Sequence, residues 1–318
     1  MDKKKKILLI SGISFMLILC TLSIIMSYLA FKEREHIQQV IVKTEPPEYK
    51  IFTPEVPEEL EFCGEKVPLL DFDVYERMER ELLVNAHWES ATILYLKRAN
   101  RWLPIIEPIL ERNGIPNDFK YLAVIESGLS NAVSPAGAAG FWQFMEPAAK
   151  KYGLEITKEI DERYNLEKST LAACKYLKDA YNNYGSWTMA AASYNFGMNG
   201  IDKQIDKQKT LNYYNLYLVE ETNRFVFRLL AMKEIFKNPK YYGFELKEDE
   251  LYKKIDTKEI VVKKGIKDLA AFAKENGINY KFLKIFNPWL RNNTLPNKSR
   301  KTYIIKIPDT SDIEIIEE

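Results

Sequence analysis

The chain is poor in residues that hold metal ions. Its 318 residues include only two His, His36 and His87, and three Cys, Cys20, Cys63 and Cys174. These residues are scattered, and no spacing typical of a metal site occurs. We therefore expect no bound metal and no other cofactor. The shortage of histidine also argues against a nucleophilic triad built on a histidine base.

An excess of charge of one sign is also missing. The 46 Lys and Arg residues nearly balance the 45 Asp and Glu residues, which leaves a net charge of +1. Proteins that bind nucleic acid usually carry a basic excess, so we expect no nucleic-acid partner. Apolar residues make up 46% of the chain, enough for a buried core. The length leaves room for more than one domain with accessory segments.

The N-terminus carries the longest apolar run. Lys3–Lys6 precede Ile7–Phe31, which contains no charged residue and exceeds the roughly 20 residues that a helix needs to cross a bilayer. A cleaved signal peptide has a shorter apolar region and then small residues, whereas Tyr28 and Leu29 stand at the end of this run. We expect residues 1–36 to form cytoplasmic lysines and an uncleaved transmembrane anchor, with the remaining chain on the extracytoplasmic (periplasmic) face.

The cysteines bear on processing and redox state. Lipidation at Cys20 is an alternative to an intact anchor, but Leu19 stands where a lipidated cysteine usually follows a small residue. Outside the cytoplasm a disulfide between Cys63 and Cys174 is permitted, although the sequence does not show that the two meet. Cys174 lies in an amphipathic helical pattern, and we expect it to be a small core residue.

Composition divides the next part of the chain into two segments. Residues 37–70 contain several prolines and interspersed acidic residues, which predicts an extended linker. Residues 71–250 have helical periodicity, including an apolar stripe from Leu218 to Phe236, and predict a mainly α-helical domain. Within it we expect a helix over Leu166–Tyr184 that ends at Gly185.

The C-terminal part changes character. Residues 257–308 begin with a strand-like segment, Glu259–Val262, and close with another, Tyr303–Pro308. Two short helical patterns lie between them. We therefore predict a small β-α-α-β module, followed by a tail over residues 309–318.

One apolar helical stretch ends on a carboxylate. Tyr121–Ile125 lead into Glu126, and Gly128 can end the helix. The negative end of the helix dipole and desolvation by apolar neighbours would both raise the pKa of this carboxyl group. A carboxyl group that stays protonated near neutral pH is what a general acid in glycosidic cleavage requires. Taken alone, this segment favours an ordinary last-turn glutamate that points into water, because such glutamates are common.

Three later segments have an unusual composition. Ser134–Gln143 is rich in small residues and ends in an aromatic pair and an amide, which suits either a tight turn or a sugar site. Ala190–Gly197 is a small-residue helix that leads to Tyr, Asn and Gly. Glu221–Val226 opens the long amphipathic helix. Each segment is weak evidence by itself.

In this order, the four segments resemble the catalytic domain of lytic murein transglycosylases with the soluble-transglycosylase, goose-lysozyme-like fold. The resemblance covers roughly Arg80 to Phe244 and predicts a mainly α, lysozyme-like catalytic domain. The family motifs Glu-Ser, Gly-Leu-hydrophobic-Gln, Ala-Tyr-Asn and Glu-Thr stand here as Glu126-Ser127, Gly140-Phe141-Trp142-Gln143, Ser193-Tyr194-Asn195 and Glu221-Thr222.

The resemblance implies cleavage of peptidoglycan glycan strands at the bond between N-acetylmuramic acid and N-acetylglucosamine. Glu126 would act first as acid and then as base, and the muramoyl C6 hydroxyl would close onto C1 to give a 1,6-anhydro end. That internal nucleophile explains why the motifs supply no second carboxylate of the kind most glycosidases need. By the same resemblance, the substrate-binding residues would be Ser134, Gln143, Tyr194, Asn195 and Glu221.

Some features depart from the family pattern. Phe225 stands where many relatives carry a Tyr after the Glu-Thr motif. Residues 257–308 resemble a degenerate LysM module, which would bind chains that contain N-acetylglucosamine or serve only as a structural cap.

Two alternative functions stay open from the sequence. A hydrolytic muramidase on the same fold would need a second carboxylate or a held water, for which Glu146 or Glu162 are candidates. A non-catalytic peptidoglycan-binding scaffold is the other alternative. Retention of Glu126 argues against the scaffold, whereas Phe225 leaves it open.

Overall fold

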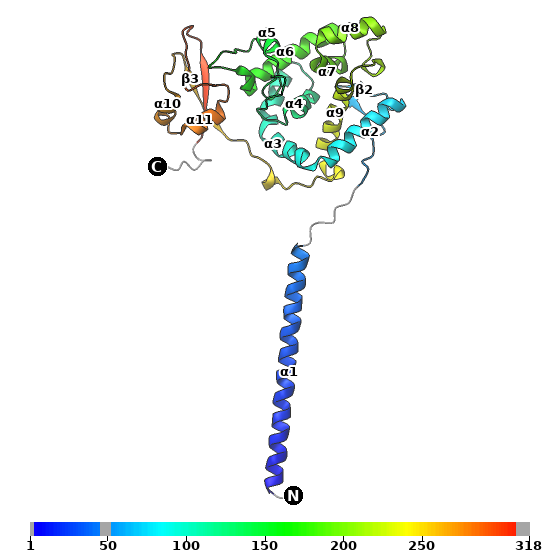
Figure 1. The fold of residues 1–318 in the computed structure, drawn as a ribbon, viewed down its shortest axis with the longest axis vertical. Coiled ribbons are helices and arrows are strands. Elements are labelled where there is room, and N and C mark those ends of the chain that lie inside the picture. The colour runs from blue at the N-terminus through cyan, green and yellow to red at the C-terminus, as the bar shows by residue number, and fades with distance from the viewer. Residues whose placement is uncertain (1–2, 45–51, 310–318) are drawn as a thin grey trace. The chain divides into compact units, whose positions relative to one another are not determined.

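The computed structural model describes residues 3–44 and 52–309 (Figure 1). The chain forms two units, Met1–Thr53 and Pro54–Glu318. In the first unit a single helix, α1, runs from Lys3 to Thr44. Its 24-residue segment Ser14–Ile37 is long and apolar enough to cross a membrane, and none of it is buried inside the protein. This helix is consistent with the predicted membrane anchor.

The structure differs from the linker predicted over residues 37–70. Helix α1 continues to Thr44, and residues 45–51 lie outside the described residues. Two short strands, β1 (Glu61–Phe62) and β2 (Glu65–Lys66), then pair as an antiparallel hairpin in the second unit. The proline-rich composition indicated an extended chain and gave no sign of this hairpin.

The hairpin belongs to the helical domain because its side chains are anchored there. Phe62 is fully buried and meets Phe119 edge to face, with ring centroids 5.3 Å apart. The Glu65 carboxylate accepts hydrogen bonds from the backbone N–H groups of Trp187 and Thr188, at 2.6 and 2.9 Å. An acidic group at a helix N-terminus satisfies free backbone donors and complements the helix dipole.

The helical domain confirms the predicted mainly α class. Helix α9 lies at its centre and packs against α2, α4 and α7, while α6 packs against α3 and α7 (Figure 1). The helices of this domain are α2 (Phe72–His87), α3 (Glu89–Arg112), α4 (Lys120–Ser127), α5 (Glu146–Lys151), α6 (Leu166–Tyr184), α7 (Trp187–Phe196), α8 (Met198–Gln208) and α9 (Glu220–Lys237). Short 3₁₀ helices are η1 (Asn117–Phe119), η2 (Glu162–Tyr164), η3 (Tyr213–Asn215), η4 (Pro239–Tyr242) and η5 (Glu248–Glu250).

Local signals explain where α6 begins and ends. The Asn165 side chain accepts a hydrogen bond from the N–H of Lys168 and caps the first turn. Gly185 ends the helix in the left-handed conformation, with φ of 65°. The helix predicted over Leu166–Tyr184 is therefore confirmed. Cys174, on this helix, is buried and has a free thiol, as expected for a small core residue.

The C-terminal module has the predicted β-α-α-β order. Strand β3 (Thr257–Val262) pairs antiparallel with β4 (Tyr303–Pro308), and α10 (Leu269–Glu275) and α11 (Tyr280–Phe286) lie between them in the chain. Asp268 caps α10 by accepting from two backbone N–H groups.

The module is docked on the helical domain rather than tethered to it. Ile160 forms an antiparallel bridge with Leu290, and the N–H of Asp161 donates to the carbonyl of Trp289 at 2.9 Å. Ile160 and Leu290 are also members of one buried apolar cluster that spans both parts. The shared cluster fixes the module in place.

Candidate active site

The carboxylate of Glu126 stands on the last turn of α4. The residues before it are buried in the core, from Tyr121 to Val124, while Glu126 itself is partly buried. Gly128 ends the helix with φ of 59°, in the left-handed region. A Cβ at this position would lie 2.6 Å from Cε1 of Tyr95, so glycine is required by space as well as by conformation.

The surroundings of Glu126 favour its protonated form. The pKa of Glu126 is raised from 4.5 to about 7, mainly by burial and to a smaller extent by the nearby charge of Glu221. The guanidinium of Arg228 acts in the opposite direction and lowers it. Desolvation dominates, so the carboxyl group holds a proton near neutral pH. This matches the pKa direction expected from the sequence and suits a general acid.

Arg228 links α9 to the turn that bears Glu126. Its Nη2 donates a hydrogen bond of 2.9 Å to the carbonyl oxygen of Ile125, the residue before Glu126. That carbonyl is one of the acceptors left free at a helix C-terminus, where a cation is stabilising. The sequence prediction missed Arg228. Its spacing of seven from Glu221, on the same helix face, was the available signal.

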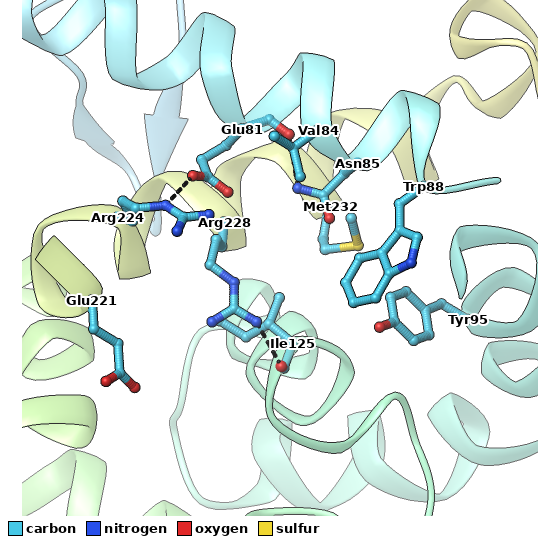
Figure 2. A pocket seen from close by; sticks show the side chains of 10 residues that line it. All are labelled: Glu81, Val84, Asn85, Trp88, Tyr95, Ile125, Glu221, Arg224, Arg228 and Met232. Atoms are coloured by element: carbon cyan, nitrogen blue, oxygen red, sulfur yellow. Dashed lines mark hydrogen bonds and ion pairs between the residues drawn. The ribbon is translucent and has the colours of Figure 1, made fainter. Parts of the chain in front are cut away.

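A cavity of about 230 Å³ lies beside this turn. Figure 2 shows the Arg228 guanidinium directed at Ile125, with Glu221 to one side and Trp88 and Tyr95 to the other. The cavity is lined by Glu81, Val84, Asn85, Trp88, Tyr95, Ile125, Glu221, Arg224, Arg228 and Met232.

The lining of the cavity contains an ion pair with a buried carboxylate. Glu81, only 1% exposed, accepts a 2.6 Å hydrogen bond from Nε of Arg224, as Figure 2 shows. Arg80 contacts the same carboxylate oxygen. A buried carboxylate needs such partners to remain charged. Because the ion pair holds α2 against α9, it helps to fix the helix that presents Glu221 and Arg228.

Helices α7 and α9 hold two of the predicted site residues together. Nδ2 of Asn195 donates to Oε1 of Glu221 at 3.1 Å, and the Thr222 hydroxyl donates to Oδ1 of Asn195 at 2.7 Å. These two bonds fix the orientation of the Asn195 amide. Glu221 remains exposed, so its second oxygen is available to a ligand.

Tyr194 lies close enough to Glu126 for the charge of that carboxyl group to affect the pKa of the Tyr194 hydroxyl. Burial raises the pKa of the Tyr194 hydroxyl well above 10, and the charge of Glu126 raises it further. The hydroxyl donates to the carbonyl oxygen of Trp142 at 2.7 Å. Tyr194 therefore connects α7 to the loop after α4 and remains neutral at physiological pH.

The side chains of Ser134 and Gln143 hold the loop between α4 and α5 in shape. Oγ of Ser134 accepts from the N–H of Ala138 at 3.0 Å. Gln143 has a positive φ of 46°, and its amide donates to the carbonyls of Ala132 and Gly140 at 3.0 and 2.8 Å. The structure thus gives both residues a role within the loop, and sugar binding by them stays a prediction.

The candidate second carboxylates from the sequence are engaged elsewhere. Glu146 pairs with Lys150 on the exposed face of α5, at 2.6 Å. Glu162 is buried, pairs with Lys168 and accepts from the N–H of Glu155 at 2.8 Å. Across the part of the chain that the structure describes, no group of three or more His, Cys, Asp or Glu is placed to hold a metal ion.

Two segments of the chain match known family models. Residues 104–217 match the family model "Transglycosylase SLT domain". This segment of the helical domain is therefore similar to transglycosylase SLT domains. Residues 258–311 match the family "Soluble lytic transglycosylase C-terminal LysM-like domain". Both resemblances predicted from the sequence are confirmed. Among the predicted site residues, Glu221 alone lies beyond the matched SLT segment.

Curated proteins are also similar to this chain. The chain is 29% identical over 231 residues to membrane-bound lytic murein transglycosylase D of Escherichia coli strain K12, covering 70% of this chain and 49% of that protein. The protein of the same name from Escherichia coli O6:H1 gives the same values. A putative tributyltin chloride resistance protein of an Alteromonas species is 28% identical over 114 residues, 35% of this chain and 55% of that protein. The chain thus spans about half the length of these curated relatives.

Proposed function

We propose that this chain is a peptidoglycan lytic transglycosylase. It would cleave the β-1,4 bond between N-acetylmuramic acid and N-acetylglucosamine without water, and would leave 1,6-anhydro ends during cell-wall turnover. The observation that carries the proposal is a partly buried carboxyl group, Glu126, whose pKa is raised to about 7 at the end of α4 in an SLT domain. The name of the Escherichia coli relatives agrees with this activity.

The proposed reaction uses Glu126 twice. The protonated carboxyl group gives its proton to the glycosidic oxygen as the bond from that oxygen to C1 of the muramoyl residue breaks. The resulting carboxylate then takes the proton of the muramoyl C6 hydroxyl, whose oxygen forms a new bond to C1. Atoms balance without water, and Glu126 is protonated again at the end. The tethered hydroxyl supplies a high effective concentration of nucleophile.

Four side chains would position the strand beside Glu126, and one would bind it at the rim. Tyr194 is kept neutral by burial, and Asn195 is held by Thr222 and Glu221. We propose that these two contact sugar next to the scissile bond, together with Ser134 and Gln143. The exposed Glu221 would bind a sugar hydroxyl and also raise the pKa of Glu126.

The hydrolytic alternative would need a second carboxylate near the bond. Glu146 and Glu162 are both paired with lysines, which leaves neither of them free as a base. A non-catalytic scaffold would have no use for a glutamate whose pKa is raised so far. Both facts favour the lytic reaction.

The anchor gives the proposed location. The apolar segment of α1 would cross the membrane with Lys3–Lys6 in the cytoplasm, and the SLT and LysM-like domains would work on the periplasmic side. We also propose residues 1–36 as the anchor, 71–250 as the catalytic domain on which the β1–β2 hairpin packs, 257–308 as the LysM-like domain and 309–318 as the tail.

Substitution of Glu126 tests the proposed role. Glu126→Gln retains the size of the side chain but has no proton to give at neutral pH. We expect it to abolish digestion of purified sacculi while binding to them persists. The matched control is Glu111→Gln on the exposed end of α3, which should digest like wild type. Digestion by Glu126→Gln at the wild-type rate would refute the assignment.

A further inference from the structure

A second and larger cavity lies where the SLT and LysM-like domains meet. Its volume is about 780 Å³. One wall comes from α3 and the loop after α4, and the other comes from α11, β4 and the segment that leads into β3. None of the residues proposed for the reaction at Glu126 lines it.

The two walls are fixed relative to each other. The Ile160–Leu290 bridge and the shared apolar cluster join the domains at one side of the cavity. Lys306 on β4 forms an ion pair with Glu167 on α6, and both residues line the cavity. A cavity between two domains locked in this way is a preformed site.

The cavity contains two arginines that no carboxylate in the described part of the chain neutralises. Arg98 and Arg101 stand three residues apart on α3 and both line it. Within the described residues neither arginine has a carboxylate partner. Nη1 of Arg98 donates to the carbonyl of Gly128 at 2.9 Å, and Nε of Arg101 donates to the carbonyl of Lys253 at 2.9 Å. Lys254 lines the same space and lies 3.7 Å from Asp256, and Glu259 is also part of the lining.

Aromatic side chains surround these cations. The Arg101 guanidinium lies 5.3 Å from the ring centre of Tyr252 and 5.9 Å from that of Trp102. Trp102 in turn meets Phe141 edge to face at 5.3 Å. Arginines held over aromatic rings are oriented and partly desolvated, which strengthens their hydrogen bonds to carboxylates. The combination fits a ligand with carboxylates and short aliphatic groups.

The cavity touches the catalytic turn. Its lining includes Leu129, Ser130 and Asn131, which directly follow the helix end that bears Glu126. Arg98 is bonded to the carbonyl of Gly128 in that same turn. A ligand in the cavity therefore lies against the loop that would also border a glycan strand at Glu126.

We propose that this cavity binds the acidic peptide stem of the strand that is being cut. The stem is the part of peptidoglycan that carries free carboxylates and short aliphatic side chains beside the sugar. The arginine pair would take a stem carboxylate, and the aromatic wall would contact the aliphatic part. The proposal rests on the proposed function, because peptidoglycan is its substrate.

Binding to matched ligands tests the site. The full-length chain in detergent, with Glu126→Gln to prevent cleavage, is titrated with a peptidoglycan tetrasaccharide that bears its peptide stems and with the same tetrasaccharide after the stems are removed. We expect the stem-bearing ligand to bind more tightly. Arg101→Gln should reduce that preference about tenfold, the usual effect of losing one hydrogen bond to a charged group. Arg101→Lys should retain most of it.

Controls separate a binding role from a structural one. Arg112→Gln, on the exposed end of the same helix, should keep the full preference. Lys254→Gln changes an exposed cavity side chain with little structural cost and should reduce the preference as well. Equal affinity for the two ligands before substitution, or an equal loss for both ligands in Arg101→Gln and no effect in Lys254→Gln, would overturn the proposal.

The outcome is distinguishable from failure of the proposed function. If the unsubstituted enzyme releases anhydro ends but stems make no difference to binding, the cavity proposal fails alone. If stems increase affinity through Arg101 but the enzyme cuts no glycan, the proposed function fails and the cavity remains a peptide site.

Discussion

Nη2 of Arg228 donates a 2.9 Å hydrogen bond to the carbonyl of Ile125, 103 positions earlier in the chain and directly before Glu126. The same guanidinium lowers the pKa of Glu126 against the larger effect of burial. Arg228 therefore acts on the turn that bears Glu126 in two ways. It fixes the backbone at the end of α4, and it limits how far the pKa of the acid rises.

Substitution of Arg228 should change the pH profile. Glu126 must be protonated to act as acid, so activity should fall as pH rises through a pKa of about 7. Removal of the positive charge in Arg228→Met raises that pKa, and the alkaline limb of kcat moves to higher pH. Arg228→Lys retains the charge and should keep the limb near its wild-type position. A lower rate with an unmoved alkaline limb in Arg228→Met would show that Arg228 acts on the backbone alone.

Removal of the negative charge of Glu221 should move the alkaline limb of kcat to lower pH, opposite to the effect of Arg228→Met. Glu221 raises the pKa of Glu126, so Glu221→Gln lowers it and the enzyme loses activity at a lower pH. Its neighbour Glu220 is also exposed and serves as the matched control in Glu220→Gln. The pH dependence of kcat measured for both variants checks this. Identical profiles for the two variants would contradict the electrostatic role given to Glu221.

The raised pKa of Glu126 should cost stability at high pH. The folded-state pKa of about 7 lies above the unfolded value of 4.5, so the folded protein binds the extra proton between these values. The free energy of unfolding therefore falls as pH rises through this window, by at most about 3 kcal/mol. Glu126→Gln removes the effect, so it should be more stable than wild type at pH 8 and close to it at pH 4. Urea unfolding at both pH values measures the difference, and a constant gap would contradict it.

Alanine substitutions at two glycines distinguish the strain of a left-handed backbone from a steric conflict with a neighbouring side chain. Gly114 and Gly128 have similar φ values, 67° and 59°, but a Cβ on Gly114 meets nothing within 4 Å. Gly114→Ala should cost about 1 kcal/mol of stability from the left-handed backbone alone. Gly128→Ala should cost about 1 to 3 kcal/mol more, because the Tyr95 ring must move. It should also reduce activity, since Tyr95 lines the cavity beside Glu126. Equal losses of stability in the two variants would show that the Tyr95 ring moves aside without an energetic cost.

Predictions from the sequence succeeded where the signal was local. The end of helix α6 was predicted because Gly185 marks it, and β4 was predicted because apolar residues dominate Tyr303–Pro308. Gly128 likewise marked the end of the helix that bears Glu126. Caps and turn glycines act within a few residues, so a single sequence reveals them.

Contacts between segments far apart in the chain could not be predicted from the sequence. The hairpin at Phe62 was not predicted, because the surrounding prolines indicate an extended chain. The burial of Phe62 in the core depends on distant residues. Arg228 was missed because only the packing of α9 on α4 places it beside Ile125. The hydrogen bonds of the Gln143 side chain within its loop were likewise not predicted. They depend on a positive φ at Gln143, which no local sequence pattern indicates.

The central claim is that Glu126 drives cleavage without water. Purified sacculi are digested by the full-length protein in water enriched in the heavy oxygen isotope, and the products are analysed by mass spectrometry. The account predicts muropeptides with 1,6-anhydro ends that carry no heavy oxygen, and none of these products from Glu126→Gln. Reducing ends that carry the heavy isotope would contradict it and make the enzyme a hydrolase.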